Sequence, residues 1–292
     1  MIALIIGTFI IGIAPLLVRY CDLAPSLIGF YRCGIAALIL LIFGFLRKHK
    51  LPKDRRFYLI TFLAGFFFAC DLFVWHRSVY LIGPGLSTIL GNTQVFYLLL
   101  FGFVLYQEKI TLKLVGLFLE AFLGILLILN GQVSFFEREI FFRGAALGLL
   151  TGLFYALYTS TIKRANTHIK DTTPFQIITF VSLFTALWSY LFSMVELEGY
   201  NRSFTDNWIP LLTLAILCQI GGWGLISTGL KKVPLAISGL VLLIQPFTAK
   251  TLSILIFDEP YSTAELLGSI LLFSCIYLAT RSKKQNKLNQ LI

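Results

Sequence analysis

The chain has 292 residues, of which 58% are hydrophobic and only 13% are charged, and its formal net charge is +10. A soluble domain of this size carries roughly 25% charged residues, so the composition excludes an ordinary soluble protein. Apolar stretches of about 20 residues, each long enough to cross a hydrocarbon core about 30 Å thick, recur along the whole length. The composition therefore predicts an all-α integral membrane protein.

In chain order, the hydrophobic pattern predicts ten transmembrane helices. Prolines stand near several of the predicted starts, such as Pro84, Pro174 and Pro234, where a missing backbone N–H costs least. No basic region precedes the first span, which favours a retained helix over a signal peptide. The predicted spans are residues 2–18, 25–46, 57–79, 84–106, 112–130, 143–164, 174–195, 208–230, 234–257 and 262–280.

The charges in the loops predict the orientation. Of 24 Lys and Arg residues, 17 fall on the side of both termini and 5 on the opposite side, while Arg32 and Lys250 lie inside spans. Because cytoplasmic loops are enriched in Lys and Arg, we expect both termini to be cytoplasmic, with residues 281–292 as a basic tail. Topology accounts for the net charge, so no nucleic-acid partner is expected.

The chain also matches itself at an offset of about 151 residues. The stretch GLSTILGNTQVFYLLLFGFVLYQEKIT aligns with AISGLVLLIQPFTAKTLSILIFDEPYS. Gln94 then falls on Gln245, and Glu108 falls on Glu259. Each half holds five spans, and because five is odd the second half must enter the membrane inverted. Inverted repeats are typical of secondary transporters, whose substrate site lies near the bilayer midplane where the repeats meet.

The sequence resembles the drug/metabolite transporter superfamily, in its ten-helix EamA-like branch, over nearly its whole length. The resemblance is carried by FYRCGIAALILLI in the second span, by DLFVWHRSVYLIGPGLSTILGNTQ, by LLLFGFVLYQEKIT followed by GLFLEAFLG, and by QPFTAKTLSILIFDEP followed by ELLGSILL. It implies EamA-like repeats over residues 1–130 and 140–280, and alternating access by rocking of spans one to four against six to nine. One departure is Val95, at a position where the family commonly has proline, as Pro246 does in the ninth span.

Three charged side chains share one depth of the predicted membrane. At 1.5 Å per residue, the three residues lie slightly to the external side of the centres of their spans; they are Arg32, Asp71 and Lys250. A charge facing lipid there would cost at least ~2.5–3.5 kcal/mol, so we expect Asp71 to pair with Lys250 or Arg32. Pairing alone does not separate a binding site from a structural ion pair, and this is left open for Asp71, Glu120 and Lys250. The resemblance favours a brace or gate for Arg32 and a helix-interface role for Glu120.

Helical spacing adds aromatic and amide side chains to these charges. Trp75 follows Asp71 by one turn, and Trp223 follows Gln219 in the same way. Trp and Tyr near the midplane need partners for their N–H and O–H groups. His76, by contrast, is expected at the outer surface. The candidate substrate-binding residues are Asp71, Trp75, Arg32, Gln94, Tyr155, Gln219, Trp223, Gln245 and Lys250.

Both charge signs, three amides and several rings suit a small zwitterionic or amphiphilic metabolite, such as an amino acid or a related amine. The nucleotide-binding pattern GxxxxGK[ST] is absent from the sequence, so the driving force must come from a gradient. We therefore predict a secondary active exporter with a midplane site, in the inner or plasma membrane of a bacterium, with protons as the candidate coupling ion.

Three alternatives to transport stay open at this point. They are a channel, a non-transporting membrane scaffold and, last, an intramembrane enzyme that would use Asp71 and His76 as acid and base. No cofactor or metal site is predicted, because the five cysteines show no paired spacing. Beyond a small-molecule substrate and the lipid bilayer, the sequence leaves the oligomeric state, including a homodimer, open.

Overall fold

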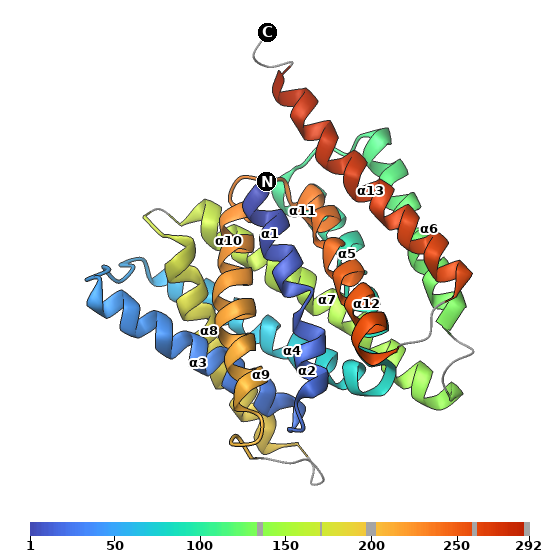
Figure 1. The fold of residues 1–292 in the computed structure, drawn as a ribbon. Coiled ribbons are helices and arrows are strands. Elements are labelled where there is room, and N and C mark those ends of the chain that lie inside the picture. The colour runs from blue at the N-terminus through green and yellow to red at the C-terminus, as the bar shows by residue number, and fades with distance from the viewer. Residues whose placement is uncertain (133–136, 170, 197–202, 259–261, 289–292) are drawn as a thin grey trace.

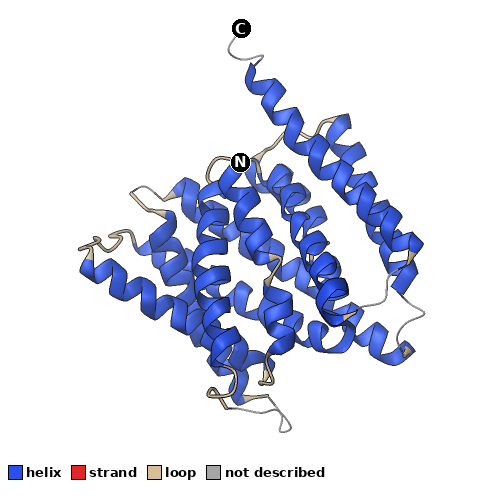
Figure 2. Ribbon diagram, viewed as in Figure 1, coloured by secondary structure: helices blue, strands red, loops and turns tan. Residues whose placement is uncertain are grey.

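The computed structural model describes residues 1–132, 137–169, 171–196, 203–258 and 262–288 (Figure 1). Within these ranges the chain forms helices and loops and no strand (Figure 2). The predicted all-α class is therefore confirmed. Glu259, which the repeat pairs with Glu108, lies outside the described residues, as do the last residues of the predicted tail.

The helices follow the apolar stretches of the sequence. They are α1 (Ile2–Ile11), α2 (Ala14–Tyr20), α3 (Pro25–Leu46), α4 (Arg55–Gly91), α5 (Gln94–Tyr106), α6 (Leu112–Gln132), α7 (Arg138–His168), α8 (Pro174–Met194), α9 (Trp208–Thr213), the π-helical segment η2 (Leu214–Gly222), α10 (Trp223–Leu230), α11 (Leu235–Leu242), α12 (Ile244–Phe257) and α13 (Thr263–Leu288).

Seven stretches of the described chain are long and apolar enough to cross a membrane. Most coincide closely with predicted spans, because an uninterrupted apolar run is the strongest signal a sequence carries for a membrane helix. The seven are Ile2–Tyr20, Pro25–Leu46, Arg55–Tyr106, Arg138–His168, Pro174–Met194, Trp208–Leu230 and Leu235–Phe257.

The stretch Arg55–Tyr106 contains two interruptions. Inside α4, Gly83 has φ 81° and ψ 163°, a conformation that is essentially confined to glycine. Pro84 follows and has no N–H to donate to the preceding turn. The helix is interrupted again at Asn92 and Thr93, before α5 begins. The predicted spans 57–79 and 84–106 thus meet at the kink at Gly83.

The second half is interrupted at matching positions. Leu243 separates α11 from α12, and it lies 151 positions after Asn92. The residues that end α5 and α12, Gln107 and Asp258, are both left-handed, with φ 52° and 50°, and they too lie 151 positions apart. Val95 stands three residues after Asn92, and the matching residue of the second half is Pro246. The first break therefore forms without the proline that follows the second.

Helices of the two halves pack against one another. The main pairs are α4 with α7, α6 with α13, α3 with α8, α4 with α8, α1 with α10 and α5 with α11. The α6–α13 pair lies at one edge of the bundle, and α1 begins on the same side of the molecule on which α13 ends (Figure 1). Small residues allow the closest approach: a Cβ built on Gly148 of α7 would lie 2.7 Å from Leu90 Cβ of α4.

Candidate functional site

A cavity lies in the middle of the bundle, between α1, α3, α4, α7, α10 and α12. Its volume is about 40 Å³, well below the roughly 300–1,000 Å³ typical of small-molecule sites, so the surrounding helices must move apart before a metabolite fits. It is lined by six of the nine predicted site residues, namely Arg32, Asp71, Trp75, Tyr155, Trp223 and Gln245. Side chains that lie far apart in the sequence therefore meet at one place.

The cavity contains one buried cation and one buried carboxyl group. Arg32 is 1% exposed and Asp71 is 5% exposed. Both side chains line the cavity, and Arg32 Cζ lies 5.6 Å from the centre of the Phe68 ring. Arg32 Nε and Asp71 Oδ1 have no hydrogen-bond partner among the described residues. Because buried polar atoms are normally hydrogen-bonded, these two atoms retain capacity for a ligand.

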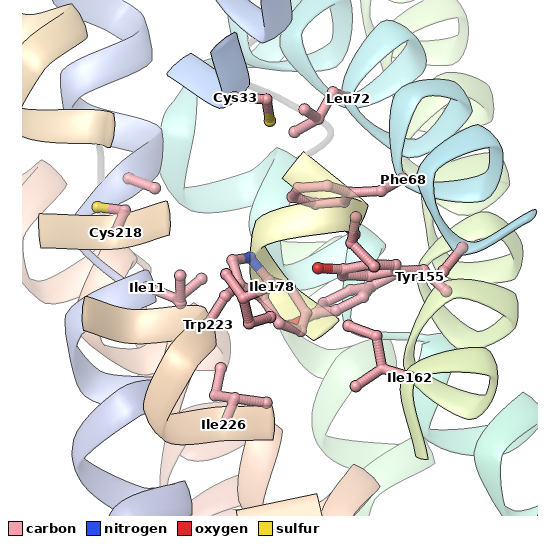
Figure 3. Close-up of a cluster of buried hydrophobic side chains, with 14 of the residues drawn as sticks. Ile11, Cys33, Phe68, Leu72, Tyr155, Ile162, Ile178, Cys218, Trp223 and Ile226 are labelled. Atoms are coloured by element: carbon pink, nitrogen blue, oxygen red, sulfur yellow. The ribbon is translucent and has the colours of Figure 1, made fainter. Parts of the chain in front are cut away.

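Aromatic rings form one wall of the cavity. The ring centres of Tyr155 and Trp223 are 5.6 Å apart at an interplanar angle of 72°, and those of Phe68 and Trp223 are 5.5 Å apart at 70° (Figure 3). Gln245 Nε2 donates a hydrogen bond to the Tyr155 hydroxyl at 2.6 Å. The edge-to-face contacts and this hydrogen bond fix the orientation of the rings. The wall offers flat apolar surface next to the two charges.

Two of the predicted amides are buried outside the residues that line the cavity. Gln219 Nε2 donates to Ser182 Oγ at 3.0 Å, which links η2 to α8. Gln94 Nε2 donates to Asn92 Oδ1 at 3.4 Å. The first contact stabilises the π-helical segment η2, and the second stabilises the break between α4 and α5.

The sequence led us to expect Lys250 in the cavity with Asp71, but Lys250 is not among the residues that line it. Its Nζ lies 2.9 Å from Glu265 Oε1, and the pair joins α12 to α13. The reason is the helical phase: Gln245, which does line the cavity, is five residues away, which is about 140° around the helix axis. The structure thus pairs Lys250 with Glu265, and Arg32 is the cation that shares the cavity with Asp71.

The prediction for His76 was wrong. His76 is fully buried, and its Nδ1 lies 2.8 Å from the Pro25 carbonyl oxygen. The start of α3 covers this face of α4, so His76 is not at the surface although it lies close to the predicted end of the third span. Arg77, next to it, is partly exposed and forms an ion pair with Glu196.

Other residues line the cavity that the sequence had not singled out as site residues, among them Phe68, Thr88 and Asn92. Thr88 and Asn92 are one turn apart, and Asn92 Nδ2 donates to the Thr88 carbonyl oxygen at 2.9 Å. The polar run GNTQ within an apolar span is a sequence signal for this break. Phe68 has no such signal, because phenylalanine occurs 28 times in the chain.

Carboxylates join the two halves at opposite ends of the bundle. At one end, Glu108, just after α5, accepts hydrogen bonds from the first backbone N–H groups of α11. At the other end, Glu196, just after α8, pairs with Arg77 of α4 and accepts a hydrogen bond of 3.3 Å from the Ser26 N–H at the start of α3. Both carboxylates thus satisfy N–H groups at helix starts, where the helix dipole favours a negative charge.

Comparison with known proteins gives the same architecture. The EamA-like transporter family matches residues 1–130 and 142–281. "Uncharacterized transporter YetK" of Bacillus subtilis (strain 168) is 28% identical over 268 residues, which cover 86% of this chain and 77% of that protein. A solved crystal structure shares the fold with a TM-score of 0.70 at 17% identity, over 94% of this chain and 98% of the other.

Proposed function

The chain belongs to the EamA-like transporter family and is a membrane transporter, and from this premise we propose that it is a secondary active exporter of a small zwitterionic or amphiphilic metabolite. An amino acid or a related amine has the required chemistry. The observation that carries this substrate class is the presence of Arg32 and Asp71 in one aromatic-walled cavity. Arg32 would bind a carboxylate and Asp71 an ammonium group, since each offers an unused polar atom.

We also propose ten membrane crossings arranged as two inverted repeats. In this arrangement Arg55–Tyr106 crosses twice, with the kink at Gly83 between the crossings, and α6 and α13 each cross once. The packing pattern supports it. Exchanging the halves turns the α1–α10 pair into the α7–α4 pair and the α5–α11 pair into the α12–α4 pair, and it leaves α3–α8 and α6–α13 unchanged; all of these pairs are in contact. The matching breaks at Asn92 and Leu243 give independent support.

Transport then proceeds by alternating access, with the cavity opening to one face at a time. The contacts of Glu108 and those of Glu196 both connect elements of different halves. Opening toward one face requires the contacts at that face to break while those at the other face persist. We place both termini, and with them Glu108, on the cytoplasmic side of a bacterial plasma membrane, on the strength of the 17-to-5 distribution of loop cations. Protons are the proposed coupling ion.

The proposal is tested by counterflow into liposomes that contain the purified protein. Vesicles preloaded with an unlabelled amino acid or amine should accumulate the labelled compound from outside for at least one zwitterion, and an imposed pH gradient should drive net movement. Protein-free vesicles and vesicles loaded with an uncharged sugar serve as controls. Accumulation of only uncharged or only anionic compounds would overturn the substrate class, and flux that never exceeds equilibration would indicate a channel.

A further inference from the structure

A second hollow lies on the outside of the bundle, along the seam between α3 and α8. It has a volume of about 480 Å³ and shares no lining residue with the central cavity. Apolar side chains such as Leu40, Leu41 and Phe45 of α3 and Phe180 of α8 line most of its length, and His49 and Lys50 line one end. The groove is thus apolar along the bundle and cationic at its end.

The cationic end belongs to a loop with an unusual density of charge. Residues 47–56 contain six Lys or Arg side chains and a single acidic residue, Asp54. Cations at the cytoplasmic end of a span are expected from topology alone. Topology, however, requires neither a fixed position for them nor an apolar groove beside them, so these two features need a separate explanation.

Contacts with both helices hold the loop in place. Gln176 Nε2 of α8 donates to the Lys50 carbonyl oxygen at 2.7 Å, and the His49 N–H donates to the Gly44 carbonyl oxygen at 2.9 Å. The His49 ring lies 4.9 Å from the Phe175 ring, at an interplanar angle of 33°. The cations therefore stand at a defined place at the mouth of the groove.

We propose that this groove binds one anionic phospholipid. An acyl chain would lie along the apolar seam between α3 and α8, and the phosphate would contact the Lys50 ammonium group and His49. A phospholipid satisfies both features because its chain and its phosphate are covalently joined, and a net negative headgroup matches the charge of residues 47–56. A zwitterionic phospholipid carries its own cation and matches that charge less well. The proposal is independent of the transported substrate.

The test titrates the purified full-length protein in detergent with phosphatidylglycerol and, separately, with phosphatidylcholine, and counts bound lipids by native mass spectrometry. We expect one phosphatidylglycerol to bind more tightly than any phosphatidylcholine. Lys50→Gln should weaken that binding about fivefold, the loss expected for one interfacial cation. Lys53→Gln is the matched control, since Lys53 lies in the same loop but does not line the groove, and it should have little effect.

A second variant tests the apolar part. Gly44→Leu should fill the groove, because a Cβ at Gly44 meets only the Phe175 ring, at 3.4 Å, and it should reduce lipid binding with every cation still present. Gel filtration checks that both variants fold. If Gly44→Leu does not fold, the result for Lys50→Gln alone decides. Equal affinity for both lipids, or equal effects of Lys50→Gln and Lys53→Gln, would overturn the proposal. Normal binding of phosphatidylglycerol by Lys50→Gln, together with no displacement of that lipid by inorganic phosphate, would also overturn the proposal.

Discussion

Glu108 and Leu235, which are 127 residues apart in the chain, are joined by a hydrogen bond of 2.5 Å from the Leu235 backbone N–H to Glu108 Oε1. The Ala236 N–H donates to Oε2 of the same carboxylate at 3.0 Å. Lys163 Nζ lies 3.9 Å from Glu108 and donates to the Val233 carbonyl oxygen at 2.5 Å. One carboxylate thus connects the end of α5, the end of α7 and the start of α11.

We predict that removing this carboxylate opens the cavity toward the face that carries Glu108. Glu108→Gln keeps the side-chain shape but removes the charge that favours the start of α11 and Lys163. A cysteine introduced at Thr151, which lines the cavity, should then react faster with an impermeant thiol reagent added to the cytoplasmic side.

The matched variant is Arg77→Gln, which removes the ion pair with Glu196 at the opposite end. It should raise labelling of the same cysteine from the external side. Each variant is compared with the Thr151→Cys protein that is otherwise unchanged. Labelling that rises from the same side in both variants, or in neither, would show that these contacts do not control access.

We predict that the buried Lys250–Glu265 pair is replaceable by leucines. The repeat places Leu99 and Leu114 at the matching positions of the first half, where both line one hollow between α5 and α6. Lys250→Leu alone should destabilise the protein by about 3–5 kcal/mol, because it leaves a buried carboxylate without this cation. Lys250→Leu/Glu265→Leu should recover most of that loss. Thermal unfolding in detergent gives the comparison, and a double variant no more stable than the single one would contradict the shared architecture.

Gly83→Ala should destabilise the kink in α4. At φ 81° and ψ 163° a side chain adds strain of about 1–3 kcal/mol. Gly116→Ala in α6 is the control, because a Cβ there meets nothing within 4 Å and alanine favours the helix. The control should unfold at or above the wild-type temperature, and Gly83→Ala below it. Equal unfolding temperatures for the wild type and Gly83→Ala would mean that the kink is not a constraint.

The sequence predicted what depends on long apolar runs and on the depth of charges within them. Spans such as 208–230 agree with the structure, and Arg32 and Asp71 meet in the cavity. Depth, however, does not give the direction of a side chain around its helix, and for that reason Lys250 was assigned to the cavity and is found against α13. His76 is buried against the start of α3, about 50 residues earlier in the chain, and no local pattern reveals such a contact. The break at Asn92 forms without proline, inside the polar run GNTQ, and α7 packs closely against it, since a Cβ built on Gly91 would lie 2.9 Å from Thr151 Cγ2.

The central claim is that Asp71 of the cavity binds the substrate, and Asp71→Asn tests it most directly. Asparagine keeps the shape of the side chain and removes the charge that would hold an ammonium group. The control is Glu120→Gln, which removes an intramembrane carboxylate that instead accepts a hydrogen bond from Ser274 between α6 and α13. Counterflow in liposomes, with gel filtration to check folding, should show transport abolished by Asp71→Asn and retained by Glu120→Gln. Wild-type transport by folded Asp71→Asn would contradict the account.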